Sequence, residues 1–253
     1  MVKKRSLKID WNIPMKIKGF EKLSLIDYPD HIACVIFLAG CNFRCHFCYN
    51  KNLVIDTHFL PDIKEEVIYS YLRERKKILE GIVVSGGEPT VHQNLPEFIQ
   101  RLQRFCLPIK LDTNGTHPEI VQALLEQKLV QYIAVDIKVP LNTHYLTLTH
   151  IKPALIFSIK QTLRLLVESR TPFELRTTVI PTVHNRYVWT TMREQVVPLL
   201  GEEASNIPWY VQPFIPGNCL DQSFNKLPPT QVPQLQEAVH ELQKSFPKAA
   251  IRA

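Results

Sequence analysis

The stretch IACVIFLAGCNFRCHFC, residues 32–48, joins an apolar run to a cluster of three cysteines. Its first part is rich in β-branched and aromatic residues and is followed by a glycine, which predicts a buried strand. Cys41, Cys45 and Cys48 then follow with the spacing Cys-x3-Cys-x2-Cys. Because thiolates are soft ligands, this loop predicts an iron–sulfur cluster or a zinc ion just after the strand.

The two metal alternatives differ in what else they need. Three thiolates can hold three irons of a cubane cluster and leave the fourth iron open to a substrate. Zinc would need a fourth ligand, for which His46 and His58 are the candidates. Structural zinc usually has a second closely spaced pair of Cys or His residues, and the sequence shows none. The spacing therefore favours the cluster.

Outward from this stretch, apolar strands alternate with amphipathic helices along the chain. We expect strands at 32–38, 81–84, 109–111, 132–137, 173–180 and 209–214, and helices at 61–79, 95–105, 118–129, 156–168, 187–200 and 231–246. This alternation predicts an α/β fold whose parallel strands are joined by right-handed crossovers.

Composition and charge limit the remaining possibilities. The 253 residues are 45% hydrophobic and 21% charged, as in a folded globular protein of one domain. No apolar run reaches the ~18 residues of a membrane helix, and no apolar segment of a secretion signal follows the basic N-terminus. We therefore expect a cytoplasmic protein that has no membrane association.

The net charge of +6 is concentrated at the N-terminus. Residues 1–22 hold seven Lys and Arg against two acidic residues, so the rest of the chain is nearly neutral and shows no nucleic-acid signature. We divide the chain into a basic extension, residues 1–22, and a single domain, residues 23–253. The extension is expected to be solvated or to dock an acidic partner.

Short motifs follow three other predicted strands. They are SGGEP at 85–89, LDTNG at 111–115 and VDIK at 135–138. A glycine pair lets backbone approach a ligand closely. Because the carboxyl ends of strands build the active sites of α/β barrels, we expect these motifs to share one site with the cysteines.

The cysteine motif, with the aromatic Phe47 before its third cysteine, resembles the signature of the radical S-adenosylmethionine (SAM) superfamily, and SGGEP resembles that group's GGE motif. This resemblance implies a partial (β/α)6 TIM-like barrel with parallel strands. It also implies a 4Fe–4S cluster on Cys41, Cys45 and Cys48, with SAM chelated to the open iron.

A narrower resemblance is carried by SLIDYP at 24–29, the LDTNG and DIK motifs, RTTVIP at 176–181 and QPFIPGN at 212–218. These segments are similar to anaerobic ribonucleoside-triphosphate reductase activating proteins, which are glycyl-radical-enzyme activases like pyruvate formate-lyase activating enzyme. Two positions depart from that pattern: Asp30 stands where glycine is usual, and Tyr49 stands where histidine is usual.

The resemblance implies a set of cofactor contacts. Lys138 matches a lysine that meets the SAM carboxylate. Further SAM contacts are expected at Phe47, Tyr49, Asn50, Gly86, Gly87, Glu88, Asp112, Asn114, Arg176 and Gln212. A monovalent cation is expected at Asp112, Thr113, Asp136 and the carbonyl of Ala134. His184 and Cys219 are interpreted as structural residues, Cys219 in an exposed loop.

The resemblance also implies the reaction. The protein would reductively cleave SAM to a 5′-deoxyadenosyl radical, with flavodoxin or ferredoxin as electron donor. The radical would take hydrogen from a glycine of a glycyl radical enzyme, expected to be an anaerobic ribonucleotide reductase. Two alternatives stay open: a radical SAM enzyme acting on a small molecule or another protein, and a non-catalytic metal-binding protein.

Overall fold

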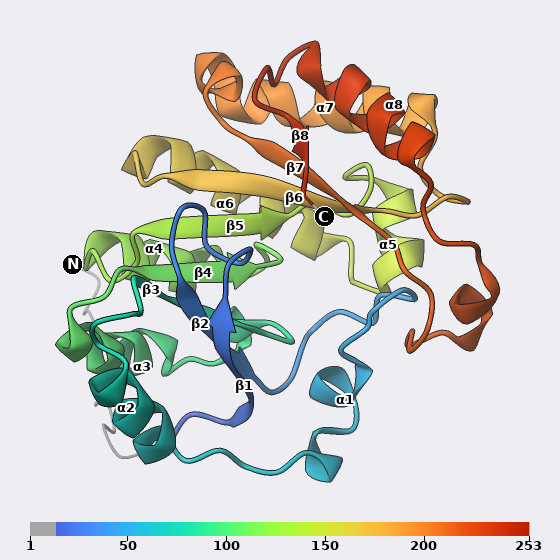
Figure 1. Ribbon diagram of the computed structural model, residues 1–253. Coiled ribbons are helices and arrows are strands. Elements are labelled where there is room, and N and C mark those ends of the chain that lie inside the picture. Colours follow the sequence, from blue (N-terminus) through green and yellow to red (C-terminus); the bar gives the residue numbers. More distant parts are fainter. Residues whose placement is uncertain (1–13, 253) are drawn as a thin grey trace, which may run out of the picture.

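The computed structural model describes residues 14–252 as one curved eight-stranded sheet with helices on its outer side (Figure 1). The strands are β1 (Ile17–Ser24), β2 (Ala33–Leu38), β3 (Gly81–Gly86), β4 (Ile109–Thr113), β5 (Tyr132–Asp136), β6 (Phe173–Val179), β7 (Trp209–Pro213) and β8 (Ala250–Ile251). The helices are α1 (Lys51–Val54), α2 (Glu65–Glu74), α3 (Leu95–Leu102), α4 (Pro118–Glu126), α5 (Thr143–Thr149), α6 (Ala154–Ser169), α7 (Arg186–Leu200) and α8 (Val232–Gln243).

Strand order in the sheet follows chain order, from β1 to β8. Strands β2 to β8 are parallel, and β1 pairs antiparallel with β2. The sheet does not close on itself, so the predicted partial (β/α)6 barrel with parallel strands is confirmed. All six predicted strands and the six main helices are present, with shifted ends.

The strands are buried on both faces, as expected for parallel strands covered by helices. In β2, Cys34, Ile36 and Leu38 pack into the large core shared with the helices. Ala33 and Val35 point to the opposite face, where a smaller core fills part of the barrel interior. Because successive side chains alternate, one apolar run supplies both cores.

The N-terminal prediction needs correction. Strand β1 was not predicted, and residues 17–22, which we assigned to a basic extension, pair with β2 in the sheet. Residues 1–13 lie outside the described residues, and so does that part of the predicted docking segment. The helix predicted from residue 61 begins only at Glu65, because Ile63 forms an antiparallel bridge with Ile17 and is extended there.

Two further observations bear on the sequence analysis. Asp30 has a φ of 59°, in the left-handed region, which explains why glycine suits this position and why aspartate is tolerated. Within residues 14–252, no helix combines the length and the apolar character that crossing a bilayer requires.

Candidate functional site

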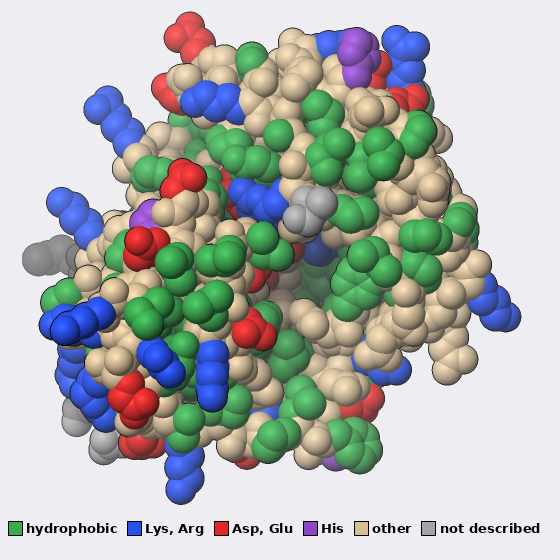
Figure 2. Space-filling model, in the orientation of Figure 1, with side chains coloured by type: hydrophobic (Ala, Val, Ile, Leu, Met, Phe, Trp, Pro, Cys, Tyr) green, Lys and Arg blue, Asp and Glu red, His purple; other side chains and the backbone are tan. Residues whose placement is uncertain are grey.

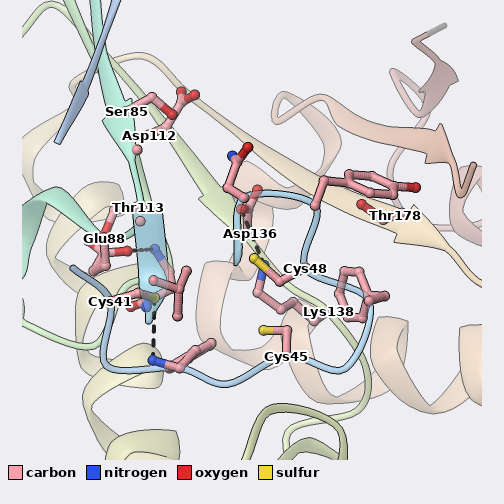
Figure 3. Close-up of a pocket in the computed structure, with 18 of the residues that line it drawn as sticks. Cys41, Cys45, Cys48, Ser85, Glu88, Asp112, Thr113, Asp136, Lys138 and Thr178 are labelled. Carbon is pink, nitrogen blue, oxygen red and sulfur yellow. Dashed lines mark hydrogen bonds and ion pairs between the residues drawn. The ribbon is translucent and has the colours of Figure 1, made fainter. Parts of the chain in front are cut away.

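A cavity of about 200 Å³ lies at the carboxyl ends of the strands, where the predicted motifs meet (Figure 3). Almost all predicted site residues line it: Cys41, Cys45, Phe47, Cys48, Tyr49, Asn50, Gly86, Gly87, Glu88, Asp112, Thr113, Asn114, Asp136, Lys138 and Arg176. Gln212 lies on β7 and is not among the lining residues. Residues from five strand ends thus converge on one hollow, although they span more than half of the chain.

The cysteine loop is held from two sides by backbone hydrogen bonds. The amide of His46 donates to the carbonyl of Leu148 in α5, and its carbonyl accepts from the amide of Asp221. The carbonyl of Cys48 accepts from the amide of Leu220. Helix α5, which the sequence did not predict, therefore fixes the position of the loop.

The cysteine side chains suit a cluster better than a single ion. All three sulfurs face the cavity (Figure 3). Within residues 14–252, no three His, Cys, Asp or Glu side chains converge on one ion position, as tetrahedral zinc would require. His46, a candidate fourth zinc ligand, instead lies 2.5 Å from His150, measured between the Nε2 atoms. A cubane takes each thiolate on a different iron, so sulfurs that face a shared hollow without converging fit it.

The thiols are protonated in the metal-free protein. Burial raises the pKa of both Cys41 and Cys45 to about 12. Lys138 opposes this shift at both residues. Binding of a cluster must therefore release protons, and Lys138 offers a positive charge to the thiolates that result.

The glycine pair after β3 is required by the approach of the chain to itself. A Cβ atom on Gly87 would lie 2.0 Å from the carbonyl oxygen of Gly40, and one on Gly86 would lie 2.3 Å from backbone atoms of Leu38. The amide of Gly87 donates to Leu38 and that of Glu88 to Gly40. The pair brings the end of β3 directly against the start of the cysteine loop.

Glu88 connects three motifs below the cavity. Its carboxylate accepts hydrogen bonds from the amide of Thr90 (3.1 Å), the hydroxyl of Thr113 (2.7 Å) and the amide of Asn114 (2.6 Å). The side chain is 1% exposed, and burial raises the pKa of its carboxyl against the effect of these bonds. Glu88 therefore acts by positioning the strand ends, through bonds that the sequence could not show.

The predicted cation site is occupied by protein charges. The Arg176 guanidinium lies 3.1 Å from Asp112 and 3.0 Å from Asp136. Lys110 bonds the other Asp112 oxygen at 2.5 Å, and Lys138 lies 3.4 Å from the other Asp136 oxygen. All four carboxylate oxygens are thus engaged, and a monovalent cation would have to displace Arg176.

The threonine of that predicted site does not contribute to a cation cage either. The Thr113 hydroxyl donates to Glu88 instead. Burial alone would raise the pKa of Asp136, but Arg176 and Lys138 hold it at about 2. The residues as arranged therefore do not fit the cation that the resemblance implied.

Lys138 is held over the cysteines by a residue that we had interpreted as structural. The carbonyl of Lys138 accepts from Nε2 of His184 (2.8 Å), and Nδ1 of His184 accepts from the amide of Ile180 (2.9 Å). Burial lowers the pKa of His184 to about 4, so the ring is neutral. The Lys138 ammonium lies 5.7 Å from the centre of the Phe47 ring, which orients it above the loop.

Sequence reasoning missed or misplaced several residues. Lys110 is fully buried and braces Asp112, and the alternation of β4 places both on one face, a signal that could have found it. Cys219 was expected in an exposed loop but is 1% exposed. Tyr49 has its hydroxyl bonded to the amide of Ile215 at 2.6 Å, so it joins the cysteine loop to the segment after β7.

The site matches known proteins in the same terms. Residues 35–194 match the Radical SAM superfamily. A "Putative glycyl-radical enzyme activating enzyme" of Methanocaldococcus jannaschii is 29% identical over 242 residues, which cover 93% of this chain and 95% of that protein. The anaerobic ribonucleoside-triphosphate reductase-activating protein of Escherichia coli is 34% identical over 73 residues, 28% of this chain and 47% of that protein.

The fold is shared with solved structures of low sequence identity. Streptococcus suis SuiB, bound to its precursor peptide SuiA, superposes with a TM-score of 0.60 at 15% identity, covering 87% of this chain and 48% of that one. Such a likeness shows the fold alone. Together with the family match over more than half of its length, the cysteine loop establishes that this chain belongs to the radical SAM superfamily.

Proposed function

We propose that the protein is a glycyl-radical-enzyme activase and that its target is an anaerobic ribonucleotide reductase. The observation that carries the proposal is the end-to-end match with the M. jannaschii activating enzyme, which covers 93% of this chain and 95% of that protein. The partial match with the E. coli reductase-activating protein supports the choice of target.

The family implies a 4Fe–4S cluster and SAM, and the cavity supplies residues that fit both. When bound to Cys41, Cys45 and Cys48, the cluster supplies the electron that cleaves SAM to methionine and a 5′-deoxyadenosyl radical. Lys138 then offers its ammonium to the SAM carboxylate as a point charge. Glu88 keeps the surrounding strand ends fixed through its hydrogen bonds.

The cavity also protects the chemistry from water. Cys45 and Phe47 are each 6% exposed, so the loop that carries the thiolates is largely shielded. A radical formed there meets few solvent molecules that could quench it. Flavodoxin or ferredoxin would deliver the electron, as the resemblance implies.

Anaerobic reconstitution tests the proposal. Protein loaded with iron and sulfide is reduced with dithionite, mixed with SAM and with the anaerobic ribonucleotide reductase of the same source, and examined by EPR. A glycyl radical on the reductase, together with 5′-deoxyadenosine, is expected. The Cys41→Ala variant should give neither product. SAM cleavage without a radical on the reductase would show that the target is wrong.

A further inference from the structure

We propose that a second pocket, beside the SAM cavity, binds the extended backbone of the protein substrate; this inference rests on the activase function proposed above. The pocket has a volume of about 260 Å³. Its walls come from Lys18 and Gly19 of β1, Phe37 of β2, the segment 49–53 and Asn218 in the loop after β7.

The pocket lies in the gap of the incomplete barrel. Strands β1 and β2 form one end of the sheet order, and the loop after β7 belongs to the other end. Tyr49 and Asn50 line both this pocket and the SAM cavity, so the two hollows share a wall. Figure 2, in the orientation of Figure 1, shows that this face of the molecule is hollowed near its centre. A chain lying in the pocket would run directly past the SAM cavity.

Three carboxamide side chains face the pocket without partners. Asn50, Asn52 and Asn218 line it, and within residues 14–252 their side chains form no hydrogen bonds. Each carboxamide offers both a donor and an acceptor. That combination complements the N–H and C=O groups of an extended peptide, which would otherwise lose their bonds to water.

The charge and shape of the pocket favour backbone over other ligands. Lys18 is the one charged residue of its lining, and its ammonium is engaged by Asp62 at 2.9 Å and the carbonyl of Leu60 at 2.8 Å. Phosphate groups would find no free guanidinium or ammonium there. A Cβ atom on Gly19 would lie 3.1 Å from Phe37, so any side chain at this position would crowd the pocket. The absence of one leaves room for a close backbone approach.

The step that this placement serves is a hydrogen-atom transfer. The C–H bond of a substrate glycine breaks, and a new C–H bond forms at the 5′ carbon of the deoxyadenosyl group. The glycine Cα keeps the unpaired electron. The external reductant has already supplied the one electron that SAM cleavage consumes.

A neutral peptide tests the pocket without the natural partner. The probe is acetyl-Val-Gly-Ser-amide with both glycine Cα hydrogens replaced by deuterium. Its affinity is measured by calorimetry on SAM-loaded, unreduced protein, and its turnover is measured as deuterium per 5′-deoxyadenosine formed after reduction. The test variant is Asn52→Ala with Asn218→Ala. Asn206→Ala, an exposed asparagine that is not part of the pocket lining, is the matched control.

Wild-type protein and the control should bind the peptide and transfer deuterium. The double variant should lose about tenfold or more in affinity, as expected for two hydrogen bonds, with a similar fall in deuterium transfer. Unchanged affinity and labelling in the double variant would overturn the inference, as would SAM cleavage by the wild type with no deuterium transfer. A radical on the reductase without peptide labelling would overturn the pocket alone. Labelling without that radical would overturn the target alone.

Discussion

His184 gives the most quantitative prediction, because its ring must stay neutral in the folded protein. One ring nitrogen accepts from the Ile180 amide and the other donates to the Lys138 carbonyl. A proton added to Nδ1 would face the Ile180 N–H, so protonation breaks this contact. Burial accordingly lowers the pKa from 6.5 to about 4.

The sign and size of the effect follow from this difference. A histidine whose pKa is lowered on folding contributes stability that is fully present above pH 6.5. This contribution is lost as the pH falls, because the unfolded chain then binds the proton more readily. Between pH 7.5 and pH 5, a shift from 6.5 to about 4 removes about 2 kcal/mol from the free energy of unfolding.

Urea unfolding of the iron-free protein at both pH values measures this term. His184→Gln cannot titrate, and its amide can still donate to Lys138. The stability difference between wild type and variant should therefore shrink by about 2 kcal/mol on going from pH 7.5 to pH 5. His144→Gln, at an exposed position of α5, controls for the substitution itself. A His184→Gln difference that stays constant between the two pH values would refute the buried neutral ring.

Three further predictions concern the cavity. Gly87→Ala places a Cβ 2.0 Å from a backbone oxygen and should lower stability by about 2 kcal/mol or more in thermal unfolding; Gly217→Ala, with nothing within 4 Å, should not. Glu88→Gln turns an acceptor towards donors and should cost about 1–3 kcal/mol and weaken SAM binding in calorimetry; an unchanged SAM affinity would contradict its positioning role. Because Arg176 fills the predicted cation site, SAM affinity should be the same in sodium, potassium and tetramethylammonium buffers, and a clear preference for one ion would show that Arg176 gives way.

The sequence predicted those parts of the fold that depend on local pattern. The apolar runs of β2 to β7 are continuous and bounded by helices of clear period, so alternation alone identified them. Strand β1 escaped because lysines interrupt its apolar residues and its antiparallel pairing contains register shifts. Helix α5 escaped because its sequence, THYLTLT, is rich in threonine and tyrosine, which favour strands. Its position is decided by the cysteine loop that it holds, which no local pattern reports.

The site divides in the same way. Cys41, Cys45 and Cys48 were predictable because their spacing is itself the chemistry of the site. The partners of Asp112 and Asp136 were not, since Arg176 follows them in the chain by 64 and 40 residues. Whether two carboxylates hold an ion or a guanidinium depends on the register of neighbouring strands, and β6 places Arg176 beside Asp136. Sequence motifs identified the right residues and assigned the wrong ligand to them.

The charges around the cavity explain why the metal-free fold can form first. Burial keeps the thiols of Cys41 and Cys45 neutral, so folding does not require thiolates to be buried without a metal. Lys138 stays charged because Asp136 lies beside it, and Asp136 in turn is held by Arg176. When the thiols lose their protons to a cluster, a paired ammonium already faces them. The buried ion pairs therefore serve cluster assembly more directly than stability, since apolar residues of similar volume could stabilise a barrel interior as well.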